Sequence, residues 1–390
     1  LACGGSARDA EGLISQSFPS PPQKKRRIDT VERQSSIHSI IKNLGNIKSH
    51  VFHGGKGKSV SLYTEEDVNR CLGPFVSLHK SIFPHEFADE LLEYLKTEGV
   101  THLKNNKFFL FDKLREANHR LGVFSKNPND KRIHYNGVVS DSKEYNYLLH
   151  KAAKMVEDFV NDEILSKQER PLKYQFTRKG SWRADRCVVN YYESGSNNLD
   201  WHSDRLNHIG PHCLIVSVSL GATREFRLRR NYNNFDSEKP LTTLPIFSIV
   251  APHNSLVIMH PGCQEEYRHC VAATTQPLEV SKISGTGRFN LTFRYFPPKF
   301  TENAPKCRCG ITMMLRRSFK EVSSRGKYFW TCERGYANES CGEYHWVDFN
   351  DVENNFISKD GRNVSKWIAA DDFAKSDFNL EQSLIALSDN

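Results

Sequence analysis

The segment RFNLTFR at residues 288–294 constrains the fold of this chain more than any other. Successive side chains of a strand point to opposite faces, so Leu291 and Phe293 face a core while the polar residues face the other way. Three more short segments, RCVVNYY, CLIVSVSLG and SLVIM, are β-branched or aromatic and are bounded by Gly, Pro or Asn. Several such strands with irregular spacing predict a sandwich or jelly roll.

Two amphipathic helices precede most of these strands. Phe87, Leu91 and Leu95 recur at helical spacing before Gly99, and a second helical pattern runs over residues 148–159. The expected fold class is therefore α+β, with a jelly-roll (double-stranded β-helix) core and flanking helices.

The charge balance favours an acidic partner. The 390 residues include 54 Lys and Arg against 46 Asp and Glu, a net charge of +8, which makes nucleic acid the first candidate. Only 38% of the residues are hydrophobic, so unstructured segments are expected beside the core. No apolar run is long enough for a membrane span. The scattered cysteines are typical of a reducing, intracellular setting.

Residues 1–70 are predicted to form a disordered, basic N-terminal region. Within it, PPQKKRRID gathers four basic residues at positions 24–27 behind two prolines. This run is either a solvated charge cluster or a nuclear import signal, and a nucleic-acid enzyme in the same chain would favour import and location in the nucleus.

The stretch LDWHSDR suggests a metal site. His202 and Asp204 are two residues apart at the end of a strand, so both can reach one ion, and an imidazole with a carboxylate suits Fe(II). A third ligand must come from elsewhere. His269 in EEYRHCV is the best candidate, with His260 and His253 as competitors. Alone, a His-x-Asp pair is more often an ordinary surface pair.

The polar face of RFNLTFR could complete such a site. Arg288, Asn290, Thr292 and Arg294 share one face of the strand, and arginine binds carboxylates through two parallel hydrogen bonds. The arginines lie ~20 Å apart at Cα, but long side chains leaning inward could meet one small dicarboxylate. The alternative is a strand with solvated arginines.

These segments together resemble the AlkB family of Fe(II)/2-oxoglutarate dioxygenases. The likeness rests on NYYESG…DWHSD, IVSVSLGATREF, YRHCV and RFNLTFRYF, over about residues 187–296. It implies that His202, Asp204 and His269 bind iron, and that Asn190, Tyr192, Arg288, Asn290 and Arg294 hold 2-oxoglutarate. It also implies oxidative removal of N-alkyl groups from DNA bases, with O2 consumed and succinate, CO2 and formaldehyde released.

The resemblance is weaker at the substrate. Some family members carry an acid two residues after the metal aspartate, where this chain has Leu206. Glu225 resembles an acidic position of duplex-directed relatives, and we expect it to pair with Arg294.

A target base must leave the duplex to reach a buried iron. Residues 121–137, LGVFSKNPNDKRIHYNG, vaguely resemble the wedge hairpin and lid of duplex-acting relatives, with Phe124 to fill the gap and Tyr135 beyond it. The alternative is an ordinary loop with Phe124 in the core.

Four cysteines follow a linker at 297–305. Cys307, Cys309, Cys332 and Cys341 are spaced for a four-thiolate zinc site. The flanking GKYFWTC and CGEYHW resemble a GRF-type zinc finger, whose basic residues and Tyr328, Phe329 and Trp330 would favour single-stranded DNA. In an alternative, these rings pack beneath the zinc.

The sequence therefore predicts four regions: the N-terminal region 1–70, an AlkB-like dioxygenase domain over 71–300, a zinc finger over 303–350, and an acidic tail over 351–390. The function expected is dealkylation of damaged DNA. Alternatives are oxidation of 5-methylpyrimidines or methylated RNA, a protein hydroxylase, and an inert nucleic-acid-binding protein. Oligomeric state and the methylated base are left open.

Overall fold

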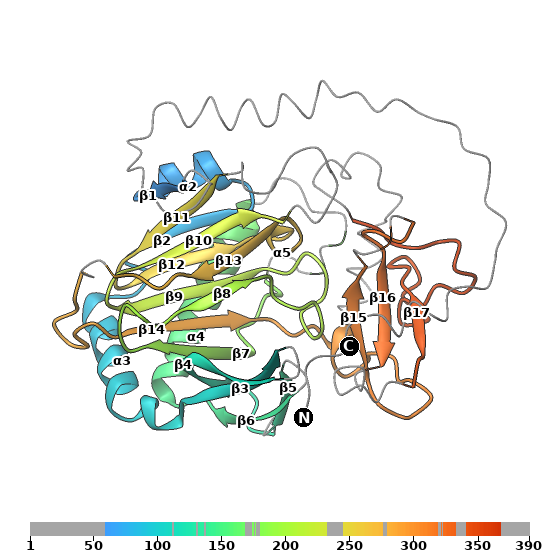
Figure 1. The fold of residues 1–390 in the computed structure, drawn as a ribbon, viewed down its shortest axis with the longest axis horizontal. Coiled ribbons are helices and arrows are strands. Elements are labelled where there is room, and N and C mark those ends of the chain that lie inside the picture. Colours follow the sequence, from blue (N-terminus) through green and yellow to red (C-terminus); the bar gives the residue numbers. More distant parts are fainter. Residues whose placement is uncertain are drawn as a thin grey trace.

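Figure 1 shows a β-rich core with helices along one side and a small three-stranded domain beside it. The computed structural model describes residues 59–367, apart from 111–112, 130–131, 136–137, 168–173, 175, 177–179, 232–244, 276–278, 319–320, 322, 333–340. Across these residues, no helix is both long and apolar enough to cross a membrane.

Two large sheets enclose the core. The first has five strands, in the order β1 (Ser59–Leu62), β11 (Ile246–Ala251), β10 (Arg224–Arg230), β13 (Tyr267–Val271), β8 (Leu199–His202). The second has the order β2 (Val76–Lys80), β12 (Ser255–Met259), β9 (Ile215–Gly221), β14 (Arg288–Arg294), β7 (Arg186–Tyr192), β4 (Lys113–Ser125), β6 (Val138–Glu144), β5 (Arg132–Tyr135), with β3 (Lys104–Leu110) on β4. Apolar side chains of both sheets form one buried cluster between them. The predicted α+β fold with a jelly-roll core is confirmed.

The helices cover the outer face of the second sheet. Leu291 and Phe293 of β14 are buried there, in one cluster with Leu91 and Leu95 of α3 (His85–Thr97) and with α4 (Tyr147–Phe159). The opposite, polar face of β14 is consequently turned towards the first sheet, as its alternation predicts. Short turns follow these helices: η1 (Gly99–His102), η2 (Val160–Ile164), η3 (Leu165–Lys167).

Two further helices lie at the ends of the first sheet. The helix α2 (Glu65–Leu72) begins at Thr64, whose hydroxyl accepts a hydrogen bond from the Asp67 amide, and its apolar residues enter the core between the sheets. The single-turn helix α5 (Cys263–Glu266) leads directly into β13. Because β1 pairs with β11, the folded domain begins before residue 71, and the boundary expected at that residue is too late.

The C-terminal domain (residues 303–367) follows η5 (Pro298–Phe300) and contains the sheet β15 (Met313–Arg317), β16 (Tyr328–Cys332), β17 (Tyr344–Trp346). Its buried cluster also includes Phe356 and Trp367, so the expected end at residue 350 is too early. The jelly-roll domain (residues 59–300) contributes Tyr174 and Phe176 to the same cluster, and the two domains therefore share a core.

Two expectations about aromatic residues are wrong. Val123 and Phe124 lie in the long strand β4 rather than at a loop tip, and Phe124 is only 2% exposed, against the helices. It cannot act as a wedge. In the C-terminal domain, Tyr328 and Trp330 are fully buried and cannot stack on bases, so they pack in its core as in the alternative interpretation. The side chain of Tyr135, and residues 1–58 with their basic run, lie outside the part described.

Candidate active site

Adjacent strands of the first sheet bring three possible metal ligands together. His202 ends β8, Asp204 follows it, and His269 lies opposite His202 in the register of β13. One ligand atom from each lies within 4.8 Å of the others. Two imidazoles and a carboxylate on one side of an ion leave open positions, the arrangement of non-haem iron oxygenases.

The protonation states of these groups suit a metal. Burial acts to raise the pKa of Asp204, but Arg294 and the two histidines outweigh it and hold that pKa at about 2. Burial, together with His202, lowers the pKa of His269 to about 3. A carboxylate and a neutral imidazole are the forms that coordinate metals. The Nδ1 of His202 lies 2.7 Å from the carbonyl oxygen of Asp200, which can only accept, so Nε2 is the ring nitrogen left available to a metal.

The competing histidines are engaged elsewhere. Nε2 of His260 lies 2.8 Å from the hydroxyl of Ser77, and His253 accepts a hydrogen bond from the Gly221 amide. The structure therefore brings His269, rather than His260 or His253, to the pair. That His269 binds iron stays a prediction.

The helix α5 holds the loop that carries the metal aspartate. The backbone amide of Asp204 donates a hydrogen bond to the Gln264 side chain (2.7 Å), and the Ser203 hydroxyl donates to the Tyr267 carbonyl (2.8 Å). The next helical residue, Glu265, accepts from the His212 amide at 2.9 Å. Gln264 could not be identified from the sequence, because it lies in a short polar turn without hydrophobic periodicity.

The polar face of β14 forms one wall of a cavity of about 680 Å³ at the metal ligands. Register places Asn290 between Asn190 of β7 and Ser219 of β9. Asn190, Tyr192, Asn290, Thr292 and Arg294 all line this cavity. Arg294 donates to Asp204 at 2.7 Å, which places one guanidinium at the metal end.

Arg288 lies behind the lining residues at the other end of the strand. It is 1% exposed, and its Nη2 donates to Ser219 and to Asn290, at 2.8 Å each. Its Nε and Nη1 have no hydrogen-bond partner within the residues described. Burial lowers its pKa to about 10, and the neighbouring Tyr192 offsets only part of this effect. A buried cation with unused donors favours an anion, so the site fits a dicarboxylate such as 2-oxoglutarate.

Glu225 does not pair with Arg294, contrary to expectation. Its carboxylate lies 2.6 Å from Arg227 on the same strand. The adjacent Phe226 lines the cavity, and successive residues of a strand face opposite sides, so Glu225 points away from it. Leu206 also lies outside the cavity and packs against the core of the C-terminal domain.

The strand β4 supplies a cavity residue that was missed. His119 is buried, stacks on Tyr192 with ring centroids 5.2 Å apart, and lines the cavity. Other residues of the same strand line it too: Glu116, Ala117, Asn118 and Leu121. Because the lining residues do not alternate, a period-two pattern does not identify this wall from the sequence.

The four cysteines of the C-terminal domain meet at the edge of its sheet. The Sγ atoms of Cys307, Cys309, Cys332 and Cys341 lie within 4.8 Å of one another. Four thiolates at such distances form the donor set of a structural zinc site.

A double sheet with a His-Asp-His cluster beside paired arginines defines an oxygenase of the iron and 2-oxoglutarate class. Residues 75–294, more than half of the chain, match the model of the 2OG-Fe(II) oxygenase superfamily, and the chain belongs to this family. The predicted enzyme class, an Fe(II)/2-oxoglutarate-dependent dioxygenase, is confirmed at the level of the family, whose cofactors are iron(II) and 2-oxoglutarate.

Similar proteins cover only part of the chain. It is 31% identical over 127 residues to the mouse alpha-ketoglutarate-dependent dioxygenase alkB homolog 3, covering 33% of this chain and 42% of that protein. It is 30% identical over 111 residues to the mouse DNA oxidative demethylase ALKBH2, covering 28% and 43% respectively. The structure of OsALKBH1 superimposes with a TM-score of 0.40 at 16% identity, over 57% of this chain and 99% of that one. The chain thus spans less than half the length of these curated relatives.

Proposed function

We propose that this protein is an oxidative demethylase of N-alkylated bases in DNA. The observation that carries the proposal is that the His-Asp-His cluster and the polar face of β14 line one cavity of about 680 Å³, with the buried Arg288 directly behind the lining residue Asn290. One similar protein is named a DNA oxidative demethylase, and another an alpha-ketoglutarate-dependent dioxygenase. The net charge of +8 suits a polyanionic substrate.

The residues have distinct roles in this reaction. His202, Asp204 and His269 would hold the iron, while Arg288, Arg294, Asn190, Asn290 and Tyr192 would hold 2-oxoglutarate. Bound together, these cofactors supply the oxidation of an N-methyl group by O2, after which formaldehyde leaves. Arg294 keeps Asp204 ionised, and Arg288 fixes the far carboxylate of the co-substrate, so the chain contributes position and charge.

The lining of the cavity suits a flipped base. Trp201, Phe226 and His119 contribute rings, and the more exposed Asn118, Asn198 and Asp200 contribute polar groups. Aromatic faces beside hydrogen-bonding groups are the usual means of holding a base that has left the stack. Because Phe124 is buried, we do not assign it to opening a duplex.

We further propose that the four cysteines bind one zinc ion in a GRF-type finger, and that the protein works in the nucleus. The close approach of the four Sγ atoms supports the first proposal. The basic run at residues 24–27 supports the second.

The test is a product assay on the full chain loaded with Fe(II), 2-oxoglutarate and O2. Substrates would be matched methylated oligonucleotides, single-stranded and duplex, deoxyribo and ribo, with the base either N-methylated or 5-methylated. We expect loss of one methyl group from N-methylated DNA, with succinate formed in equal amount. Product only from RNA or from 5-methylpyrimidines would move the assignment to those substrates. No product, with an intact iron complex, would refute it.

A further inference from the structure

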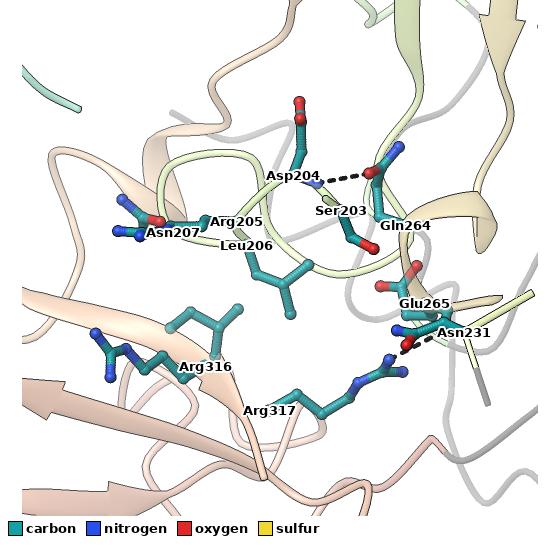
Figure 2. Close-up of a pocket in the computed structure, with 11 residues that line it drawn as sticks. Ser203, Asp204, Arg205, Leu206, Asn207, Asn231, Gln264, Glu265, Arg316 and Arg317 are labelled. Carbon is teal, nitrogen blue, oxygen red and sulfur yellow. Dashed lines mark hydrogen bonds between the residues drawn. The ribbon is translucent and has the colours of Figure 1, made fainter. Parts of the chain in front are cut away.

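A second cavity of about 390 Å³ lies between the jelly-roll domain and the C-terminal domain (Figure 2). One wall is the loop of residues 203–207, which directly follows β8. The other wall is the end of β15, formed by Leu315, Arg316 and Arg317. We call this cavity the interdomain cleft.

The interdomain cleft and the active-site cavity meet at that loop. Ser203, Asp204, Arg205 and Asn207 line both cavities. A bound polymer with one unit in the active-site cavity can therefore cross this loop and place its next unit in the cleft.

Arginines from both domains line the cleft. In Figure 2, Arg205 and Arg316 extend towards the same side, one from each domain. Arg317 turns the other way and donates to the carbonyl oxygens of Glu265 (3.1 Å) and Trp367 (3.3 Å), which fastens the two domains together.

The two acids that line the cleft are engaged within the jelly-roll domain. Asp204 is already paired with Arg294 at 2.7 Å. Glu265 is 2% exposed, and its burial raises its pKa, which favours the neutral form. Leu206, which is partly buried, adds an apolar side chain to the lining of the cleft.

We propose that the interdomain cleft binds the nucleotide next to the target base, in a strand whose target base occupies the active-site cavity. Arg205 and Arg316 bind its phosphate, while Leu206 contacts its sugar or base. Arginine matches phosphate geometry with paired hydrogen bonds. A cavity of about 390 Å³ is at the lower end of the range for ligand sites, and so suits one nucleotide rather than a duplex. This inference rests on the proposed function, and it makes the C-terminal domain a wall of the substrate path.

Binding of single-stranded oligonucleotides to the full chain, loaded with metal and 2-oxoglutarate without O2, tests the proposal. The variant is Arg316→Ala. Its control is Arg362→Ala, which removes the same charge from the same domain at a side chain that is 87% exposed and outside the cleft. The probes are a long strand with one central N-methylated base and the corresponding mononucleotide.

We expect Arg316→Ala to weaken long-strand binding about tenfold or more, and to do so by a larger factor than mononucleotide binding. It should also flatten the slope of log affinity against log salt by about 0.7, the value for one lost contact to a single strand. Arg205→Ala should act in the same direction, and Arg362→Ala should change neither quantity. In the unmutated protein, a photoreactive nucleotide beside the target base should cross-link to residues 313–317.

Equal salt slopes for Arg316→Ala and Arg362→Ala, or cross-links only outside residues 313–317, would overturn the assignment of the cleft. If the long oligonucleotide is still demethylated in that case, the proposed function is unaffected. Demethylation that is absent from every oligonucleotide would instead overturn the proposed function. If no nucleic acid binds at all, both are overturned.

Discussion

Replacing Arg288 with methionine should leave the protein as stable as before, or more stable, while removing most of its affinity for 2-oxoglutarate. The guanidinium is 1% exposed and uses only Nη2 for hydrogen bonds to described side chains. Burial lowers its pKa from 12.5 to about 10. At about 1.4 kcal/mol for each tenfold, this corresponds to roughly 3 kcal/mol against the charged form.

The substitution removes that cost and loses two hydrogen bonds, each worth about 1 kcal/mol. Asn290 keeps a partner, because the Ser217 hydroxyl also donates to its Oδ1. The net change should lie between zero and a gain of about 1 kcal/mol, which corresponds to a rise in Tm of no more than about 2–4 °C for a domain of this size. Loss of a charge-assisted pair worth about 1.5–3 kcal/mol should weaken 2-oxoglutarate binding roughly 10- to 150-fold.

Thermal unfolding with and without 2-oxoglutarate, and titration calorimetry of the co-substrate, measure both effects. Arg294→Met is the matched contrast. Arg294 is paired with Asp204, so its removal leaves a buried carboxylate uncompensated and should destabilise the metal-free protein by about 3–5 kcal/mol. The reasoning fails if Arg288→Met destabilises the protein as strongly, or if its affinity for 2-oxoglutarate is unchanged.

Four shorter predictions follow. Phe124→Ala should cost about 3–5 kcal/mol of stability, because the ring is buried, and should impair duplex and single-stranded substrates equally; a loss confined to duplex would restore the wedge interpretation. Burial raises the pKa of Glu266 from 4.5 to about 7, so its contribution to stability is full below pH 4.5 and falls as pH rises to about 7. In denaturant titrations, Glu266→Gln should therefore be more stable relative to the unmutated protein at pH 8 than at pH 4.5. A stability difference between the two proteins that does not change with pH would contradict this. A fragment of residues 303–350 lacks Trp367 and should show poor NMR dispersion even with zinc, whereas native-like spectra would mean that its core is self-sufficient. His269→Ala should abolish turnover and weaken Co(II) binding in calorimetry, and His260→Ala should do neither; the reverse would reassign the third ligand.

Much of the site could be predicted because it depends on the alternation of side chains within single strands. Alternation along RFNLTFR separates Leu291 and Phe293 from the arginines, and strand geometry does the same in the structure. The wrong predictions concern which neighbouring element each face of a strand contacts. Phe124 lies in a strand within the sheet, where both faces are covered, so alternation does not indicate its partner. The expected pairing of Glu225 with Arg294 was wrong, because the sequence does not show which face of β10 turns towards β14 in the opposite sheet.

The role of CQEEY at residues 263–267 could not be predicted, because its partners lie far away in the chain. Gln264 holds the amide of Asp204, Glu265 is contacted by Arg317, and Glu266 accepts from the Trp367 indole at 3.3 Å. A single turn of helix thus touches the metal loop on one side and the C-terminal domain on the other. Removing that domain would uncover Glu265 and Glu266, which are 2% and 6% exposed, and would let the turn relax. The same deletion would strip Leu206 of its packing, two residues from a metal ligand. A truncated enzyme is therefore a poor test of nucleic-acid binding by the C-terminal domain, because its iron site changes at the same time, and point substitutions on the surface of β15 separate the two effects.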